Sequence, residues 1–153
     1  MNHPRDILSP LTLVLLTFCL SGCQVTFVTP YDAIFDQQVT TAQTDMDALL
    51  TQIATSPAAD DPKTSDVTYT AVSGAYAHIA NDLDAMALRA ASHPDNGATT
   101  SAVAKIRHSF DLLRAQHAAD GVMRVGHAED ERDQLNHDFQ ILMAQELAKQ
   151  RGS

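Results

Sequence analysis

Four stripes of apolar residues constrain the fold of this 153-residue chain more than any other feature of its sequence. Within each stripe the residues recur three or four positions apart, which places them on one face of an α-helix. The stripes are Phe35, Val39, Ala42, Met46, Leu49 and Ile53; Tyr69, Val72, Tyr76, Ile79, Leu83, Met86 and Ala90; Val103, Ile106, Phe110, Leu113 and His117; and Leu135, Phe139, Leu142 or Met143, and Leu147. This pattern predicts four amphipathic helices.

Signals at the ends of the stripes predict the helix boundaries. Thr29 can cap the first helix with Pro30 at its first position, and Pro57 follows its end. The second helix is expected to stop at His93, because Pro94 drives the preceding residue out of helical geometry.

The third helix is expected to close at Gly121, since glycine suits the left-handed residue that follows a helix. The fourth is expected to begin near His127 or Ala128. Its first turn would then hold acids, which the helix dipole favours there. These acids are Glu129, Asp130 and Glu131.

Helices of similar length with short links predict an all-α fold, an antiparallel up-down-up-down four-helix bundle over residues 31–153. Helix hairpins that complete their core by oligomerising are the alternative. In the bundle, the starts of helices one and three meet the ends of helices two and four. This pole is expected to gather Tyr31, Asp32, Asp36, Arg89, His93, Glu146 and Lys149. The opposite pole would carry the 57–65 and 120–127 loops.

Residues 1–22 have the three-part form of an export signal. A polar head with Arg5 precedes an apolar core at 11–20, and small residues then precede Cys23. The core is too short to span a bilayer as a helix. An uncleaved buried helix and a freely secreted protein are the alternatives.

The sequence Leu20-Ser21-Gly22-Cys23 resembles the lipobox of bacterial lipoproteins. The resemblance implies cleavage before Cys23, lipid attachment to its sulfur and acylation, for example with palmitate, of the new amino terminus. Residues 23–30 would then form a lipidated tether. No cofactor other than this covalent lipid is expected.

The net charge and the cysteine content restrict the kinds of partner and of chemistry that we expect for this chain. The formal charge of −9 does not change on removal of the signal, which holds only Arg5 and Asp6 as charged residues. Such a chain repels phosphate backbones, so nucleic acid is excluded as an expected partner. Cys19 would leave with the signal and lipid would cap Cys23, so no thiol would remain for disulfide, metal or catalytic chemistry. The expected partners are the membrane, through acyl chains, and an envelope protein.

Three short segments resemble small helical lipoproteins of Gram-negative bacteria: Tyr31-Asp32, Arg132-Asp133-Gln134-Leu135-Asn136 and Glu146-Leu147-Ala148-Lys149. The resemblance implies a fold and a location and carries no activity. Gln24 stands where an aspartate retains many lipoproteins in the inner membrane. The expected location is therefore the inner leaflet of the outer membrane, facing the periplasm.

Among the six histidines after the signal, His117 alone continues an apolar stripe. It could pair with Glu129, Asp130 or Arg132 on the facing helix, and this group is the candidate binding site. The plainer interpretation is a histidine stabilised by the dipole at the end of its helix.

A metal site could be built from His108, Asp133 and His137, since nitrogen and oxygen ligands at such spacing hold zinc or copper. Both histidines are expected to face outward, so no metal site is predicted and this group stays an alternative. The sequence has no Gly-rich phosphate loop and no Gly-x-Ser-x-Gly motif, and no catalytic residues are predicted.

The sequence thus favours a lipid-anchored envelope protein with a non-enzymatic binding or scaffolding role. The alternative is a periplasmic helical bundle that binds or senses a metal or small ligand.

Overall fold

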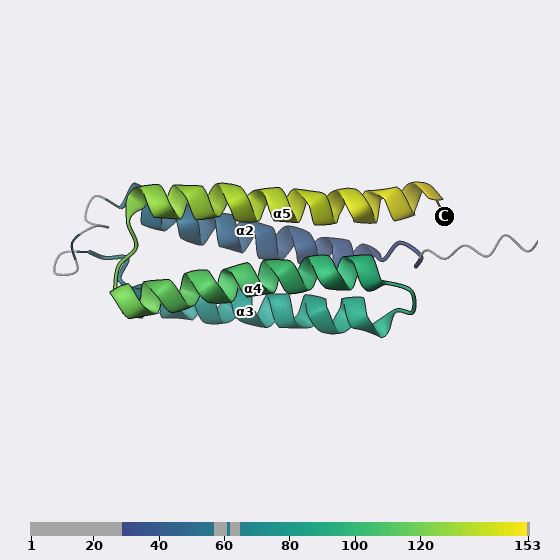
Figure 1. Ribbon diagram of the computed structural model, residues 1–153, viewed down its shortest axis with the longest axis horizontal. Coiled ribbons are helices and arrows are strands. Elements are labelled where there is room, and N and C mark those ends of the chain that lie inside the picture. The colour runs from purple at the N-terminus through teal and green to yellow at the C-terminus, as the bar shows by residue number, and fades with distance from the viewer. Residues whose placement is uncertain (1–28, 57–60, 62–64, 153) are drawn as a thin grey trace, which may run out of the picture.

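A computed structural model describes residues 29–56, 61 and 65–152. The lipobox, Gln24 and most of the 57–65 loop lie outside the described residues. The helices are α2 (Ala33–Thr55), α3 (Tyr69–Ser92), α4 (Gly97–Asp120) and α5 (Val125–Gly152). They run side by side along one long axis (Figure 1). Within the described residues, none of them is long and apolar enough to cross a lipid bilayer.

The predicted antiparallel up-down-up-down four-helix bundle is confirmed. Each helix packs against two neighbours: α2 against α3 and α5, and α4 against the same two. We call the end with the starts of α2 and α4 the proximal pole, and the other end the distal pole. At the distal pole the Tyr69 amide donates a hydrogen bond to the Gly121 carbonyl (3.0 Å), which joins the start of α3 to the end of α4.

One apolar core runs the length of the bundle. All members of the first and third stripes are buried, as is every member of the second except Tyr69, which is half-buried. Residues outside the stripes complete the core at its edges, including Leu50, Val67, Met123 and Ala128. A single chain therefore supplies all four walls of its core, without the second copy that the alternative requires.

The fourth stripe holds two corrections. Leu147, expected in the core, is 44% exposed, and its neighbour Glu146 is buried at 1%. Helix α5 also begins at Val125, earlier than the expected His127 or Ala128. Its first turn therefore contains no acid, and Glu129 lies in the second turn instead. The buried position goes to Glu146 because α4 and α5 supply its hydrogen-bond partners, as described below.

The start of α2 also differs from the expectation. Asp32, not Thr29, is its N-cap, and its carboxylate accepts hydrogen bonds from the amides of Ile34 (3.0 Å) and Phe35 (3.2 Å). The Thr29 hydroxyl instead donates to the Pro94 carbonyl (2.6 Å). This hydrogen bond ties the chain before α2 to the turn between α3 and α4.

Two predicted helix ends are confirmed. His93 is the C-cap of α3 and has extended backbone geometry, as its position before a proline requires. Gly121 follows α4 in the left-handed conformation, with φ of 76°, and its amide donates to the His117 carbonyl.

Candidate functional site

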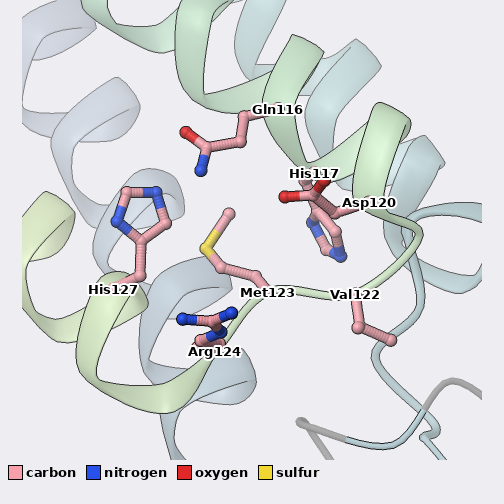
Figure 2. Close-up of a pocket in the computed structure, with 7 residues that line it drawn as sticks. All are labelled: Gln116, His117, Asp120, Val122, Met123, Arg124 and His127. Carbon is pink, nitrogen blue, oxygen red and sulfur yellow. The ribbon is translucent and has the colours of Figure 1, made fainter.

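A cavity of about 730 Å³ lies at the distal pole, where α4 ends and α5 begins. The connection between these helices forms part of its wall, together with residues from each helix (Figure 2). Its lining consists of Gln116, His117, Asp120, Val122, Met123, Arg124 and His127. The cavity thus occupies the 120–127 loop region that the sequence assigned to this pole.

His117 is the most deeply buried of the residues that line this cavity, with 1% of its surface exposed. Its Nδ1 lies 3.0 Å from the hydroxyl of Tyr76, a fully buried residue of α3. Burial raises the pKa of Tyr76 well above its ordinary value, so the phenol keeps its proton and donates it to Nδ1. A neutral His117 ring that accepts at Nδ1 carries its own hydrogen on Nε2.

The second ring nitrogen is enclosed by the bundle as well. His117 Nε2 is buried. Burial lowers the pKa of His117 below 6.5, an effect that the Val67 backbone and the Asp120 charge oppose. The ring is therefore held neutral on a residue that lines the cavity, with its second nitrogen buried.

A second ring in the cavity has the same property. His127 of α5 is half-buried, and its Nε2 is buried without a hydrogen bond, 4.0 Å from a carboxylate oxygen of Glu131. Figure 2 shows the Met123 side chain between His127 and His117, with Gln116 close by. The lining combines polar side chains, among them Gln116 and Arg124, with an apolar thioether, which suits a ligand with polar groups and some apolar surface.

The structure does not gather the candidate binding group predicted from the sequence. His117 faces Tyr76 and Tyr69 of α3, with ring centroids 5.7 and 5.8 Å away. Glu129 and Asp130 are exposed on α5, and Arg132 forms an ion pair with its neighbour Asp133 (3.4 Å). Ala128 is the buried residue in this part of α5, because it lies two turns before the buried Leu135 on the same face.

The alternative metal group is not gathered either. His108 is exposed on α4, whereas Asp133 and His137 line an open groove between α2 and α5 together with Asp47. Among the described residues, three metal-ligand side chains come together at a different place: Asp45 of α2 with His78 and Asp82 of α3. The four-residue spacing of His78 and Asp82 can be found in the sequence. The register of α2 against α3, which brings Asp45 beside them, cannot.

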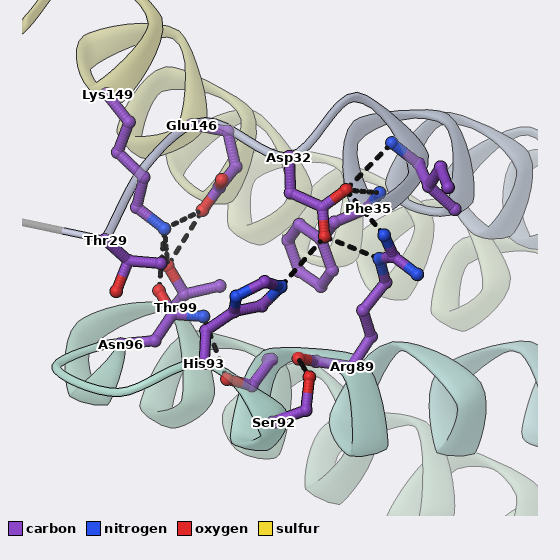
Figure 3. Close-up of polar contacts among 12 residues, drawn as sticks. Thr29, Asp32, Phe35, Arg89, Ser92, His93, Asn96, Thr99, Glu146 and Lys149 are labelled. Carbon is purple, nitrogen blue, oxygen red and sulfur yellow. Dashed lines mark hydrogen bonds and ion pairs between the residues drawn. The ribbon is translucent and has the colours of Figure 1, made fainter. Parts of the chain in front are cut away.

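The proximal pole holds a network of charged groups (Figure 3). Arg89 donates two hydrogen bonds to the Asp32 carboxylate (2.5 and 2.8 Å), and His93 Nε2 lies 3.1 Å from the same group. These contacts, above all those from Arg89, hold the pKa of Asp32 well below its usual range. Tyr31 donates to Asp36 (3.0 Å), so this part of the predicted proximal cluster is confirmed.

The rest of the proximal cluster lies between α4 and α5. The buried Glu146 carboxylate accepts hydrogen bonds from the Thr99 hydroxyl (2.8 Å) and from Lys149 Nζ (2.7 Å). Lys149 also donates to Asn96, whose amide in turn donates to the Ala90 carbonyl. Because these buried polar groups hydrogen-bond one another, the cluster is suited to hold the helix ends together and not to bind a ligand.

No family model, no curated protein and no solved structure matches this chain.

Proposed function

We propose that this chain is a lipid-anchored protein of the bacterial cell envelope with a non-enzymatic binding role, and that the distal cavity is its binding site. The resemblance of Leu20-Ser21-Gly22-Cys23 to a lipobox supports the anchor. One observation carries the binding role: a cavity of about 730 Å³ at the distal pole is lined by two histidines, His117 and His127, together with Gln116, Arg124 and Met123. A concave site that combines polar side chains with apolar surface is the usual form of a binding site.

The position of the tether supports an orientation. Thr29 is bound to Pro94 at the proximal pole, and the stretch from Cys23 to Thr29 can span at most about 20 Å. A lipid on Cys23 would hold the proximal pole close to the membrane. The distal cavity, roughly 35 Å further along the helices, would then face the periplasm from the inner leaflet of the outer membrane.

The cavity chemistry favours binding over catalysis. Its lining has donors in His117, His127, Gln116 and Arg124 and an apolar contact in Met123. The residues that line it include no serine, threonine, cysteine or lysine to act as a nucleophile. The occupant that fits is a segment of an envelope protein that offers a carbonyl or carboxylate together with apolar surface.

A small ligand of the same chemistry is the second candidate. The lining favours it, because two imidazole rings, those of His117 and His127, and two further polar side chains, Gln116 and Arg124, surround one cavity. A small molecule with acceptor groups could hydrogen-bond the Gln116 and Arg124 side chains.

Site-specific photo-crosslinking in intact envelopes tests this proposal. A crosslinking residue at Val122, in the cavity wall, is expected to capture an envelope protein, whereas one at the exposed Leu88, towards the proximal end of α3, is not. Labelled palmitate should enter the native chain and not Cys23→Ser, which should also leave the membrane fraction. Equal capture from both positions would contradict the binding site, and a membrane-bound Cys23→Ser variant would contradict the anchor.

A further inference from the structure

We propose that Asp45, His78 and Asp82 form a binding site for a divalent transition-metal ion of the zinc type, on the face that α2 and α3 share. The site is separate from the distal cavity and does not depend on the function proposed for it. Asp45 comes from α2, and His78 and Asp82 lie one helical turn apart on α3. One ligand atom from each residue lies within 4.8 Å of the other two.

The spacing of these atoms fits a shared metal ion. His78 Nε2 lies 3.4 Å from Asp45 Oδ2 and 3.6 Å from Asp82 Oδ2. Both distances are longer than an ordinary hydrogen bond. Zinc binds imidazole nitrogen and carboxylate oxygen at about 2.0–2.1 Å, so two ligands at the tetrahedral angle are roughly 3.3 Å apart. The observed separations are therefore close to the ligand–ligand edges of a tetrahedral zinc site.

The Asp82 carboxylate has unused capacity. Its Oδ2 is buried and accepts no hydrogen bond, although a carboxylate oxygen can accept two or more. Asp82 also lines a cavity of about 180 Å³ between α2 and α3. Three protein ligands leave one position of a tetrahedral zinc ion open, and water can fill it because the side chain of His78 is 64% exposed.

The charge of the surrounding face favours a cation. Asp45 and Asp82 bring two carboxylates to the site, and the one lysine or arginine of α2 and α3, Arg89, lies elsewhere. Arg89 is engaged by Asp32 at the proximal pole. Two carboxylates near each other on this face repel one another, and a divalent ion between them removes that repulsion.

The ligand set indicates the class of metal. One imidazole and two carboxylates suit zinc and its neighbours in the first transition row better than calcium or magnesium, which prefer oxygen alone. The side chain of His78 is 64% exposed, so the ion can enter and leave without opening the bundle. A bound ion would also join α2 to α3 near the middle of both helices.

Isothermal titration of zinc chloride into the full-length chain in detergent tests the site near neutral pH, where the imidazole is available as a ligand. We expect one ion per chain with a dissociation constant of about 10 µM or tighter. His78→Ala should weaken binding at least tenfold, and Asp45→Asn should weaken it as well. Both side chains lie outside the core, so circular dichroism should show an unchanged fold.

His137→Ala is the matched control, because His137 also lies four residues from an aspartate, Asp133, on an exposed helix face. It should leave zinc affinity unchanged. Binding much weaker than about 100 µM, or equal affinity in the native chain and His78→Ala, would overturn the proposal. Loss of affinity in His137→Ala would place the ion in the α2–α5 groove and would overturn it too.

Discussion

The hydroxyl of Tyr76 and the Nδ1 atom of His117 lie 3.0 Å apart inside the bundle, 41 residues apart in sequence. The pair joins α3 to α4 just beneath the distal cavity. It also fixes which nitrogen of His117 carries the hydrogen, because a neutral ring that accepts at Nδ1 is protonated on Nε2.

Replacing Tyr76 by phenylalanine keeps the ring and removes the donor. The buried Nδ1 of His117 then loses its partner, so the free energy of unfolding should fall by about 1–3 kcal/mol in urea titration. Tyr69→Phe is the matched control, because the Tyr69 hydroxyl accepts a longer hydrogen bond (3.3 Å) from Arg114 at a half-buried position. An equal loss in both variants would contradict the special role of the Tyr76 hydroxyl.

The neutral state of His117 predicts an acid sensitivity. Burial lowers its pKa in the folded chain below the value of 6.5 that applies in the unfolded chain. The unfolded state therefore binds more protons as pH falls through 6.5, and stability should decrease from that point downward. The groups around the ring are Tyr69 and Tyr76 on α3, Asp120 on α4 and His127 across the cavity.

His117→Gln separates this effect from the other histidines. The variant cannot gain a proton in the unfolded state, so its melting temperature should fall less than that of the native chain between neutral pH and about pH 5. Parallel melting curves for both proteins would show that His117 does not carry the acid sensitivity.

Asp32 predicts a second, lower pH window. Arg89 and the two α2 amides depress its pKa in the folded chain below 3.8, so its contribution is present above that pH and is lost as pH falls further. Asp32→Asn should keep much of the helix cap while removing the charge. The difference in stability between Asp32→Asn and the native chain should therefore shrink in strong acid. Asp32→Ala should remain about 1 kcal/mol less stable than the native chain, because it also loses the helix cap. Thermal melting of the three proteins across this pH range measures both differences.

The buried ion pair of Glu146 and Lys149 predicts an asymmetry between single and double variants. Lys149→Met leaves a buried carboxylate without its cation and should destabilise the bundle by about 3 kcal/mol or more. The double variant Glu146→Leu/Lys149→Met should recover much of that loss. Urea titration of the three proteins measures it, and a double variant as unstable as Lys149→Met would count against the explanation.

Two glycines in open surroundings should respond with opposite signs. A Cβ at Gly121 meets nothing within 4 Å, but its φ of 76° strains any L-residue, so Gly121→Ala should cost about 1 kcal/mol. Gly74 lies inside α3 with equally open surroundings, and Gly74→Ala should stabilise the chain by roughly 0.5–1 kcal/mol. Calorimetric melting of both variants tests the difference.

The bundle was predictable because three of its stripes are strong. Phe35, Tyr76 and Phe110 stand at positions whose spacing admits only a helix, and all are buried. The fourth stripe is weaker, and Leu147 and Glu146 exchanged the places expected for them. Periodicity assigns the apolar residue to the core, whereas Glu146 is buried because Thr99 and Lys149 satisfy its carboxylate, a condition set by tertiary contacts.

The candidate sites were less predictable for a related reason. His117 could be assigned to the core from its stripe, but Tyr76 as its partner depends on how α3 and α4 align. The cluster of Asp45 with His78 depends on the alignment of α2 with α3. An apolar stripe predicts which face of a helix is buried. It does not predict the axial register of that helix against its neighbour.

The hydrogen bond from Thr29 to Pro94 has a mechanical consequence. A pull on the chain before Thr29 reaches this contact first and the Asp32–Arg89 ion pair next. Both contacts join the start of α2 to the region where α3 ends. The force is therefore divided between α2 and α3 from the start. It acts parallel to the helix axes, in shear, so α2 should resist separation from the bundle one turn at a time.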